Sequence, residues 1–363
     1  MPSYRTGEVV ALLEARAGLQ RVEVDLGDGP ERAYALTQLT GPVTLGDQVV
    51  VNTTAVELGL GTGGWHVVHW NLARDHWSEP GPGHIIKGRY TSLQTDVGST
   101  EEHLEALAEV DSIEGMPVVV AALHSQLPAA AAAFKDRAPD ATLAYVMTDG
   151  AGLPLALSDL VASLRAAGLV DATVTCGHAF GGDFEAVSIF SALAVARHVA
   201  HADAAVVVMG PGIVGTNTRL GFSGMEVGPI LDAVHALDGV AIACLRISFA
   251  DRRDRHQGLS HHSATALRLA ARERALVAVP DLPPDQAAHL RADFVAAGID
   301  QRHELVQVDA PDALALFARY GFDIVSMGRP AAADPALFHA AAAAGALAAR
   351  NITERTVTER VDG

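Results

Sequence analysis

The sequence contains little lysine and few aromatic residues. Among its 26 basic residues only Lys87 and Lys135 are lysines, and aromatic side chains make up 5% of the chain. The 43 acidic residues outnumber the basic ones, so that the formal net charge is −17. Carboxylates in such excess repel phosphate groups at long range. We therefore expect neither a nucleic-acid partner nor an anionic membrane surface as a partner.

Cysteine and long hydrophobic runs are also scarce. Cys176 and Cys244 lie in separate apolar runs and form neither a CxxC motif nor a disulfide framework. They are expected to be small buried residues. The amino-terminal residues lack the apolar core of a signal peptide, and no apolar run reaches the ~18 residues that span a bilayer. The sequence therefore predicts a cytoplasmic protein.

What the chain does contain is enough apolar material for two domains. It has 363 residues, of which 49% are hydrophobic. Short valine-rich runs fill the first part, and Gly27-Asp28-Gly29 between two of them is typical of a hairpin turn. We predict a small β-barrel-like domain with its linker over residues 1–95. Its expected strands are 7–15, 19–26, 31–37, 48–52 and 65–70.

From residue 117 onward, apolar strand-like runs alternate with Ala- and Leu-rich helical runs, which predicts an α/β domain over residues 96–363. We expect a mostly parallel sheet of about eight strands in a layered, doubly wound arrangement, with a (β/α)8 barrel as the alternative. Polar residues in run 304–308 indicate an edge strand, which only an open sheet has. The expected strands are 118–123, 142–147, 172–176, 204–209, 240–247, 276–279, 304–308 and 323–326. The expected helices are 128–137, 154–167, 183–201, 224–237, 261–274, 284–297, 312–320 and 334–350.

Ligands of both architectures bind at the carboxyl ends of the strands, which directs attention to the loops there. The segment 210–224 is a glycine-rich loop between an expected strand and helix. Its glycines would let the backbone approach an anion, which its hydroxyl and amide groups would bind. Alternatively, the glycines only turn the chain, because the spacing matches neither GxGxxG nor a P-loop. The candidate ligand-binding residues are Gly210, Gly212, Gly215, Thr216, Asn217 and Thr218.

Histidines and an aspartate follow several of these strands. We predict acid–base catalysis by a set at one sheet edge. The alternative is a divalent metal such as Zn²⁺ or Mn²⁺, held by His124, His178 and His261. Ser260 is a good helix N-cap, and the adjacent His261 and His262 are expected to point apart. The candidate catalytic residues are His124, Asp149, His178, His256 and His261.

Three basic residues complete the candidate ligand-binding set. Arg246 lies in an apolar run and Arg329 follows the last expected strand, so a buried arginine here needs a carboxylate such as Asp149 or an anionic ligand. Lys87 lies between the two expected domains, where ligand sites are common, although it could equally be an exposed linker charge. The charged loop 251–255 is expected to be solvated and internally paired.

Four segments together resemble an uncharacterised bacterial family that is described as a domain of unknown function. Its members have about this length, and the resemblance covers nearly the whole chain. It implies a bacterial, cytoplasmic, full-length architecture and supplies no catalytic residues. The segments are GHIIKGRYTSLQ (83–94), TDGAGLP (148–154), GPGIVGTNTRLGFSG (210–224) and SFADRRDRHQGLSHHS (248–263).

These observations favour an enzyme that acts on a small phosphorylated or carboxylated metabolite by hydrolysis or group transfer. The expected partner is a small anionic molecule, and we expect neither nucleic acid nor a membrane as a partner. The sequence leaves open whether the chain forms a homo-oligomer. A non-catalytic sensor or scaffold that binds a ligand is the alternative. A dinucleotide-dependent oxidoreductase is disfavoured because the GxGxxG fingerprint is missing.

Overall fold

The computed structural model describes residues 1–61 and 63–362. The chain divides into two compact units, Met1–Gly98 and Ser99–Gly363. The predicted domain boundary at residue 95 lies close to this division. No helix in the described part of the chain is long and apolar enough to cross a membrane.

The first unit is a closed barrel of five strands in the order β1-β2-β3-β5-β4, which confirms the predicted small all-β domain. Neighbouring strands are antiparallel except β3 and β5, which are parallel. Alternate residues such as Val22 and Val24 point into its apolar interior. The barrel strands are β1 (Tyr4–Arg16), β2 (Leu19–Asp25), β3 (Pro30–Leu36), β4 (Gln48–Asn52) and β5 (His66–Asn71). The unit also contains α1 (Thr37–Thr40), α2 (Thr54–Glu57), β6 (Ile86–Lys87) and β7 (Thr95–Asp96).

The second unit is built on an open sheet of eight strands, in the order β11-β10-β9-β12-β8-β13-β16-β17. All of its strand pairs are parallel. The layered arrangement is therefore confirmed, and the chain does not form the alternative (β/α)8 barrel. The strands are β8 (Pro117–Val120), β9 (Leu143–Met147), β10 (Ala172–Thr175), β11 (Phe184–Glu185), β12 (Ala204–Val207), β13 (Val240–Ala243), β16 (Leu276–Pro280) and β17 (Glu304–Val308).

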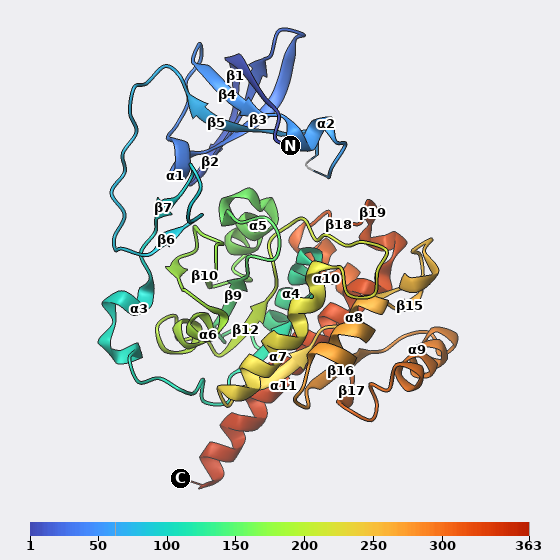
Figure 1. Cartoon of the computed structure of the whole chain (residues 1–363). Coiled ribbons are helices and arrows are strands. Elements are labelled where there is room, and N and C mark those ends of the chain that lie inside the picture. Colours follow the sequence, from blue (N-terminus) through green and yellow to red (C-terminus); the bar gives the residue numbers. More distant parts are fainter. Residues whose placement is uncertain (62, 363) are drawn as a thin grey trace. The chain divides into compact units, whose positions relative to one another are not determined.

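Helices cover both faces of this sheet (Figure 1). Successive side chains of a strand enter opposite layers, as Val119 packs in one apolar cluster and Val118 in the other. Both faces are buried, which is why the strands read as continuous apolar runs. The helices on one face are α4 (Leu127–Arg137), α5 (Asp159–Ala166), α10 (Ala313–Tyr320) and α11 (Pro335–Asp362). On the other face lie α6 (Ile189–His198), α7 (Val227–Ala236), α8 (His261–Thr265) and α9 (Pro284–Ala297).

One predicted strand and two predicted helix starts are wrong, since α5 begins at Asp159 and not at 154. Run 323–326 does not join the sheet; its β18 (Val325–Ser326) pairs only with β19 (Arg329–Pro330). The eighth strand is instead β11, at the start of the predicted helix 183–201, and α6 begins only at Ile189. Only two residues of β11 pair with β10, too few to show a strand periodicity. The predicted edge strand is confirmed, because β17 is exposed along most of its length and forms one edge of the sheet.

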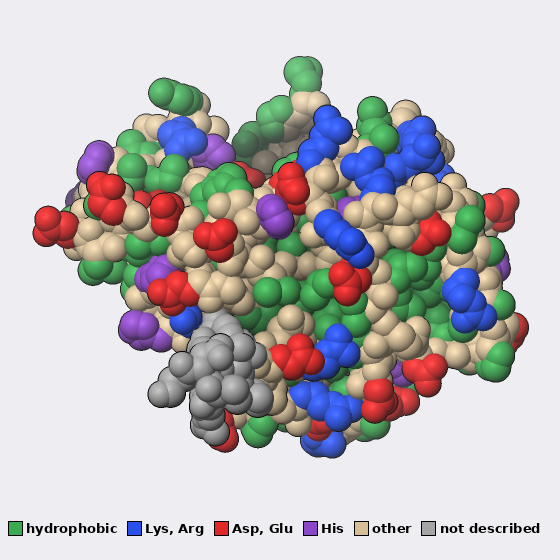
Figure 2. All heavy atoms as spheres, turned by 90° about the horizontal axis from the view of Figure 1, so that it is seen from below, with side chains coloured by type: hydrophobic (Ala, Val, Ile, Leu, Met, Phe, Trp, Pro, Cys, Tyr) green, Lys and Arg blue, Asp and Glu red, His purple; other side chains and the backbone are tan. Residues whose placement is uncertain are grey.

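Short elements connect the larger ones and carry much of the candidate site. The strands β14 (Ile247–Ser248) and β15 (Gly258–Leu259) pair to form a two-stranded antiparallel ribbon. A π-helical turn, η6 (Ala266–Ala270), follows α8. The remaining elements are α3 (Thr100–His103), η1 (Glu105–Leu107), η2 (His124–Gln126), η3 (Leu155–Leu157), η4 (Ser223–Glu226), η5 (Asp254–His256) and η7 (Ala331–Ala333). Figure 2 shows acidic and basic side chains interspersed on the face that it draws.

Candidate functional site

Two groups of polar side chains lie beyond the carboxyl ends of the sheet strands. The first, which we call the Arg/His centre, follows β13 and comprises Arg246, Asp251, Arg253, Arg255, His256, His261, His262, Arg329 and Asp334. The second, which we call the carboxyl centre, follows β9 and comprises Thr148, Asp149 and Glu226. The position of both agrees with the rule that open α/β sheets bind ligands at this edge.

Three histidines converge in the Arg/His centre. One ring nitrogen from each of His256, His261 and His262 lies within 4.8 Å of the others. The ring centroids of His261 and His262 are 4.4 Å apart, so the expectation that these neighbours point apart is wrong. Ser260 caps α8 as predicted: its Oγ accepts from the His262 backbone N–H and lies 2.7 Å from His256 Nδ1. The ribbon β14–β15 folds the loop back, which brings His256 to the start of this helix.

Arginines surround a buried carboxylate beside the histidines. Asp251, 3% exposed, accepts two hydrogen bonds from Arg253 at 2.9 and 2.7 Å and lies 4.0 Å from Arg246. Arg329 lies 3.5 Å from Asp251 and donates to Asp334 at 2.9 Å. Arg253 is paired and partly exposed, as predicted for its loop, but Asp251 is buried and not solvated. Asp149, suggested above as a partner for Arg246, is not one of the groups described around it; His262 and Asp251 are.

Burial and positive charge keep these histidines neutral. Burial lowers the pKa of His256 and of His262 to about 3, and the nearby Arg246 guanidinium adds to both shifts. The pKa of His261 is lowered by burial and by Arg255. Burial also lowers the pKa of Arg246, to about 10, which leaves it charged near neutral pH. The centre therefore offers neutral imidazoles among permanently charged guanidiniums.

The hydrogen bond from Arg246 decides how the histidine triad can be used. Arg246 Nη1 donates to His262 Nδ1 at 3.0 Å. A guanidinium can only donate, so His262 must carry its proton on Nε2 and has no lone pair left there for a metal. Histidine ligands of metals normally donate from the other nitrogen to an acceptor. The triad in this arrangement does not fit a divalent metal, and four neighbouring arginines oppose a further cation.

The metal set predicted from the sequence, His124, His178 and His261, is not brought together. Among the described residues, the side chains close enough to share one ion are the histidine triad above. His124 Nδ1 lies 3.2 Å from the Met209 carbonyl oxygen and its Nε2 lies 2.7 Å from Ser158 Oγ. Both ring nitrogens of His124 are therefore engaged within the fold. Burial lowers its pKa to about 4, so that this imidazole is uncharged near neutral pH.

Several nitrogen atoms of the Arg/His centre are buried without a partner. His261 Nε2, Arg255 Nε and Arg329 Nε have no hydrogen bond among the described residues. Buried polar atoms are nearly always paired, so three unpaired nitrogens in one region call for an explanation. Arg246, Arg253 and Arg329 lie beside the carboxylates of Asp251 and Asp334, and Arg255 adds a charge that acts on His261, so that arginines outnumber carboxylates in this centre. An anion would accept hydrogen bonds from the guanidinium nitrogens of Arg255 and Arg329 and would offset this charge.

The glycine-rich loop contributes to this centre in an unexpected way. Phe222 stacks on His262 at a centroid distance of 3.9 Å and meets His261 edge-on at 5.6 Å. The predicted ligand-binding hydroxyls instead fold the loop: Thr216 Oγ1 lies 2.8 Å from Thr218 Oγ1, and Gly221 N–H donates to Thr218 Oγ1. Four of the predicted ligand-binding residues are exposed in this turn: Gly215, Thr216, Asn217 and Thr218. Gly212 is exposed just before the turn, and Gly210 is packed against the Gly152 carbonyl.

The carboxyl centre has the opposite character. Burial and the neighbouring Asp149 raise the pKa of Glu226 to about 7, although Thr148 Oγ1 donates to it at 2.8 Å. Asp149 is exposed and accepts from the His178 backbone N–H at 2.9 Å. Gly177 permits this contact, because it has a φ of 64° and a Cβ there would lie 2.3 Å from the Asp149 carboxylate. Glu226 can therefore hold a proton near neutral pH.

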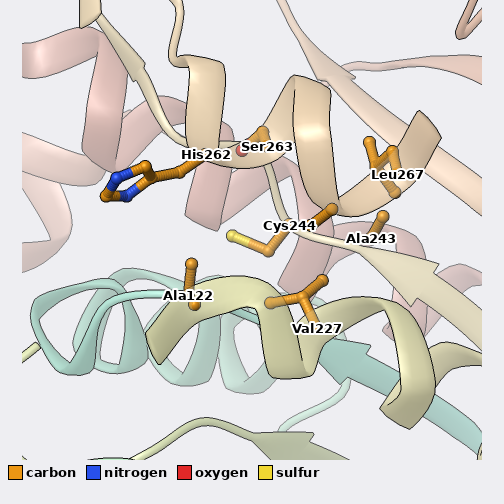
Figure 3. A pocket seen from close by; sticks show the side chains of 9 residues that line it. Ala122, Val227, Ala243, Cys244, His262, Ser263 and Leu267 are labelled. Carbon is orange, nitrogen blue, oxygen red and sulfur yellow. The ribbon is translucent and has the colours of Figure 1, made fainter. Parts of the chain in front are cut away.

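A small cavity lies between the Arg/His centre and the sheet. Its volume is about 10 Å³, the space of roughly one water molecule. Figure 3 shows the side chains that line this cavity, with the His262 ring at one end of the row and Leu267 at the other. The mostly apolar lining and the small volume do not suit a metabolite. The lining residues are Ala122, Gly224, Val227, Ala243, Cys244, His262, Ser263, Ala266 and Leu267.

The model of a family described as a protein of unknown function, DUF3866, matches residues 32–345. The chain belongs to this family. A search of curated proteins finds no match. The DUF3866 match covers most of both units and includes both polar centres, and it confirms the resemblance stated above.

Several residues of the two centres were not predicted as site residues from the sequence. Glu226 was missed because its position in the turn before α7 carries no motif; its place beyond a strand end is the one signal. His262 was set aside on the expectation that it points away. Arg253, Arg255 and Phe222 lie in segments that were singled out for other residues. Lys87, predicted as a ligand residue, is buried in the first unit within β6.

Proposed function

We propose that the protein is an enzyme that acts on a small phosphorylated or carboxylated metabolite by hydrolysis or group transfer. The Arg/His centre is its anion site in this proposal. The single observation that carries it is the pair of buried, unpartnered guanidinium Nε atoms of Arg255 and Arg329 in a region of excess positive charge. Buried polar atoms are nearly always paired in folded proteins, so these nitrogens favour a bound group.

The chemistry of the centre suits negative charge that develops during a reaction. Guanidinium groups held by Asp251 and Asp334 are already oriented, so they stabilise an oxyanion without reorganising. A neutral imidazole beside them keeps a lone pair and can act as a nucleophile at neutral pH. His256 and His261 supply such imidazoles, whereas His262 is fixed by Arg246 and Phe222.

Anion binding is the first test of the proposal. Isothermal titration calorimetry with inorganic phosphate and with acetate should show saturable binding of at least one of them to the full chain. Arg329→Gln should weaken it about tenfold or more, as expected when a charged hydrogen bond is lost. Arg319→Gln is the matched control, because Arg319 is exposed and paired with Asp136 on the surface. Equal binding by the Arg329 variant and the wild type would contradict the assignment of the site.

Turnover separates the enzyme from the alternative of a ligand-binding sensor. A panel of phosphate esters and carboxylate esters should reveal hydrolysis that the Arg329→Gln substitution reduces. Anion binding without turnover of any of these esters would favour the sensor or scaffold. Elemental analysis of the purified protein tests the metal alternative: stoichiometric zinc or manganese that is lost in a His256→Ala variant would overturn the anion assignment.

A further inference from the structure

The Arg/His centre contains one histidine whose reactive nitrogen is not engaged in the fold. We propose that His261 Nε2 is a nucleophile that accepts the phosphoryl group of a phosphate monoester and forms a phosphohistidine. This inference rests on the proposed function and deepens it, because it names the substrate class and the covalent step. Nothing in the family description assigns such a step.

The contacts of the three histidines single out His261. His256 is 1% exposed and its Nδ1 lies 2.7 Å from Ser260 Oγ. His262 accepts from Arg246 and is stacked on Phe222, so its ring is held on two sides. His261 Nε2, in contrast, is buried and has no partner among the described residues, while the rest of the side chain is partly exposed.

The charge of the centre favours a phosphate over a carboxylate. Arg246, Arg253 and Arg329 lie beside the two carboxylates of Asp251 and Asp334, and Arg255 acts on His261, so that four guanidiniums stand against two carboxylates in the centre. A phosphate monoester carries about −1.5 to −2 at neutral pH, whereas a carboxylate carries a single charge. Guanidiniums also match the oxygen geometry of phosphate and stabilise its transferring phosphoryl group.

The covalent step balances without a metal or a redox partner. The lone pair of His261 Nε2 attacks phosphorus, the P–N bond forms, and the P–O bond to the alcohol breaks; the leaving oxygen takes a proton from water and releases hydroxide. In the second step hydroxide attacks phosphorus, the P–N bond breaks, and neutral His261 and hydrogen phosphate are restored. The sum is hydrolysis of the ester by one water molecule.

Movement of Phe222 would open one side of His261, because this nitrogen is buried and the Phe222 ring meets the His261 ring edge-on. Phe222 lies at the base of an exposed turn, which is closed by the hydrogen bond from Thr216 N–H to the Gly221 carbonyl oxygen. The turn includes Leu220, which is 60% exposed and packs little against the rest of the chain. Displacement of this turn would uncover His261 without disturbing the sheet.

Phosphoramidate tests the proposal directly, because its leaving group is ammonia and needs no recognition or proton donor. The intact protein should gain one phosphoryl group, and peptide mapping at neutral or basic pH should place it on His261. We expect His261 to react at least about tenfold faster than the exposed His235, since only His261 lies among guanidiniums that stabilise the transferring group. Inorganic phosphate should compete, and Phe222→Ala should accelerate labelling.

Two variants make the result specific. His261→Gln should abolish fast labelling, while His235→Gln on the surface of α7 should leave it unchanged. Circular dichroism shows whether the His261 variant is folded; if it is not, the mapped label on wild-type protein decides alone. Binding of inorganic phosphate without fast labelling of His261 would overturn this inference and leave the proposed function standing. Absence of phosphate and acetate binding would overturn both.

Discussion

The two polar centres lie at the same edge of one sheet but carry opposite charge, and their pKa shifts have opposite sign. The Arg/His centre follows β13 and has an excess of positive charge, which together with burial keeps its histidines neutral at neutral pH. The carboxyl centre follows β9 and has an excess of negative charge, so Glu226 retains a proton up to a pKa of about 7. In both places burial is the largest cause of the shift, and neighbouring like charges add to it.

This difference teaches that the two centres respond to pH with opposite sign. A histidine with a lowered pKa makes the folded protein less stable as pH falls. Below a pH of about 6.5 the unfolded chain takes up a proton that the folded chain does not. A carboxyl group with a raised pKa makes the folded protein less stable as pH rises from about 4.5 to about 7. Over this range the unfolded chain releases a proton that the folded chain keeps. Between pH 4.5 and 6.5 the two contributions oppose each other.

The largest expected effect is at the carboxylate that holds the arginines together. Asp251→Ala should lower the free energy of unfolding by about 3 kcal/mol, because it leaves buried Arg246 without a counter-charge beside Arg253 and Arg329. Urea denaturation at pH 7 measures this loss. Asp251→Asn keeps the hydrogen-bond acceptor and removes only the charge, so it should cost less. A loss as small as that of Asp136→Ala, whose arginine partner is on the surface, would show that the Arg/His centre does not depend on buried charge balance.

A gain in stability is expected at the carboxyl centre. Glu226→Gln should raise the free energy of unfolding at pH 8 by about 2 kcal/mol, since the buried carboxylate is removed while an acceptor for Thr148 remains. At pH 4 the wild-type group is already protonated, and the variant should then show almost no difference. Urea denaturation at the two pH values gives both numbers. An effect of the same size at pH 4 and pH 8 would contradict the raised pKa.

The histidines are expected to change the free energy of unfolding with pH in the opposite direction to Glu226. Wild-type stability should fall between pH 7.5 and pH 5, and His262→Gln should reduce this fall by about 1 kcal/mol, because Gln takes up no proton in the unfolded state. Comparing the two pH values cancels packing losses that do not depend on pH. His235→Gln, an exposed control, should leave the fall unchanged. An equal fall in the His262 variant would mean that this histidine titrates alike in the folded and unfolded chain.

The smallest effects are expected in the exposed glycine-rich turn. Thr216→Val and Thr218→Val remove hydrogen bonds within the turn and should each cost about 0.5 kcal/mol. Phosphate affinity, measured by calorimetry, should stay within about twofold of wild type, because these hydroxyls are engaged with the turn. A large loss of affinity would restore the interpretation of these threonines as ligand-binding residues.

The sequence predicted the fold well because burial leaves a strong pattern. Five valine-rich runs became the five barrel strands, and seven of the eight predicted α/β runs supplied sheet strands. The eighth strand was missed because β11 pairs through only two residues. The candidate site was predicted less fully. His256 and His261 meet as part of one centre, and Arg246 and Arg329 belong to it, but His124 is engaged elsewhere and Glu226 carried no motif.

The sequence by itself determined the two-part architecture and the sheet edge at which polar loops gather, because periodicity and apolar runs report which residues must be buried. Only the tertiary structure decided which of those polar residues meet. Ring orientation, and with it the hydrogen bond from Arg246 that fixes the proton of His262, depends on how the β14–β15 ribbon folds back onto α8. Charge balance is likewise a property of neighbours in space: a chain with a net charge of −17 encloses a small positive centre, in which Arg329 joins the arginines of segment 246–255.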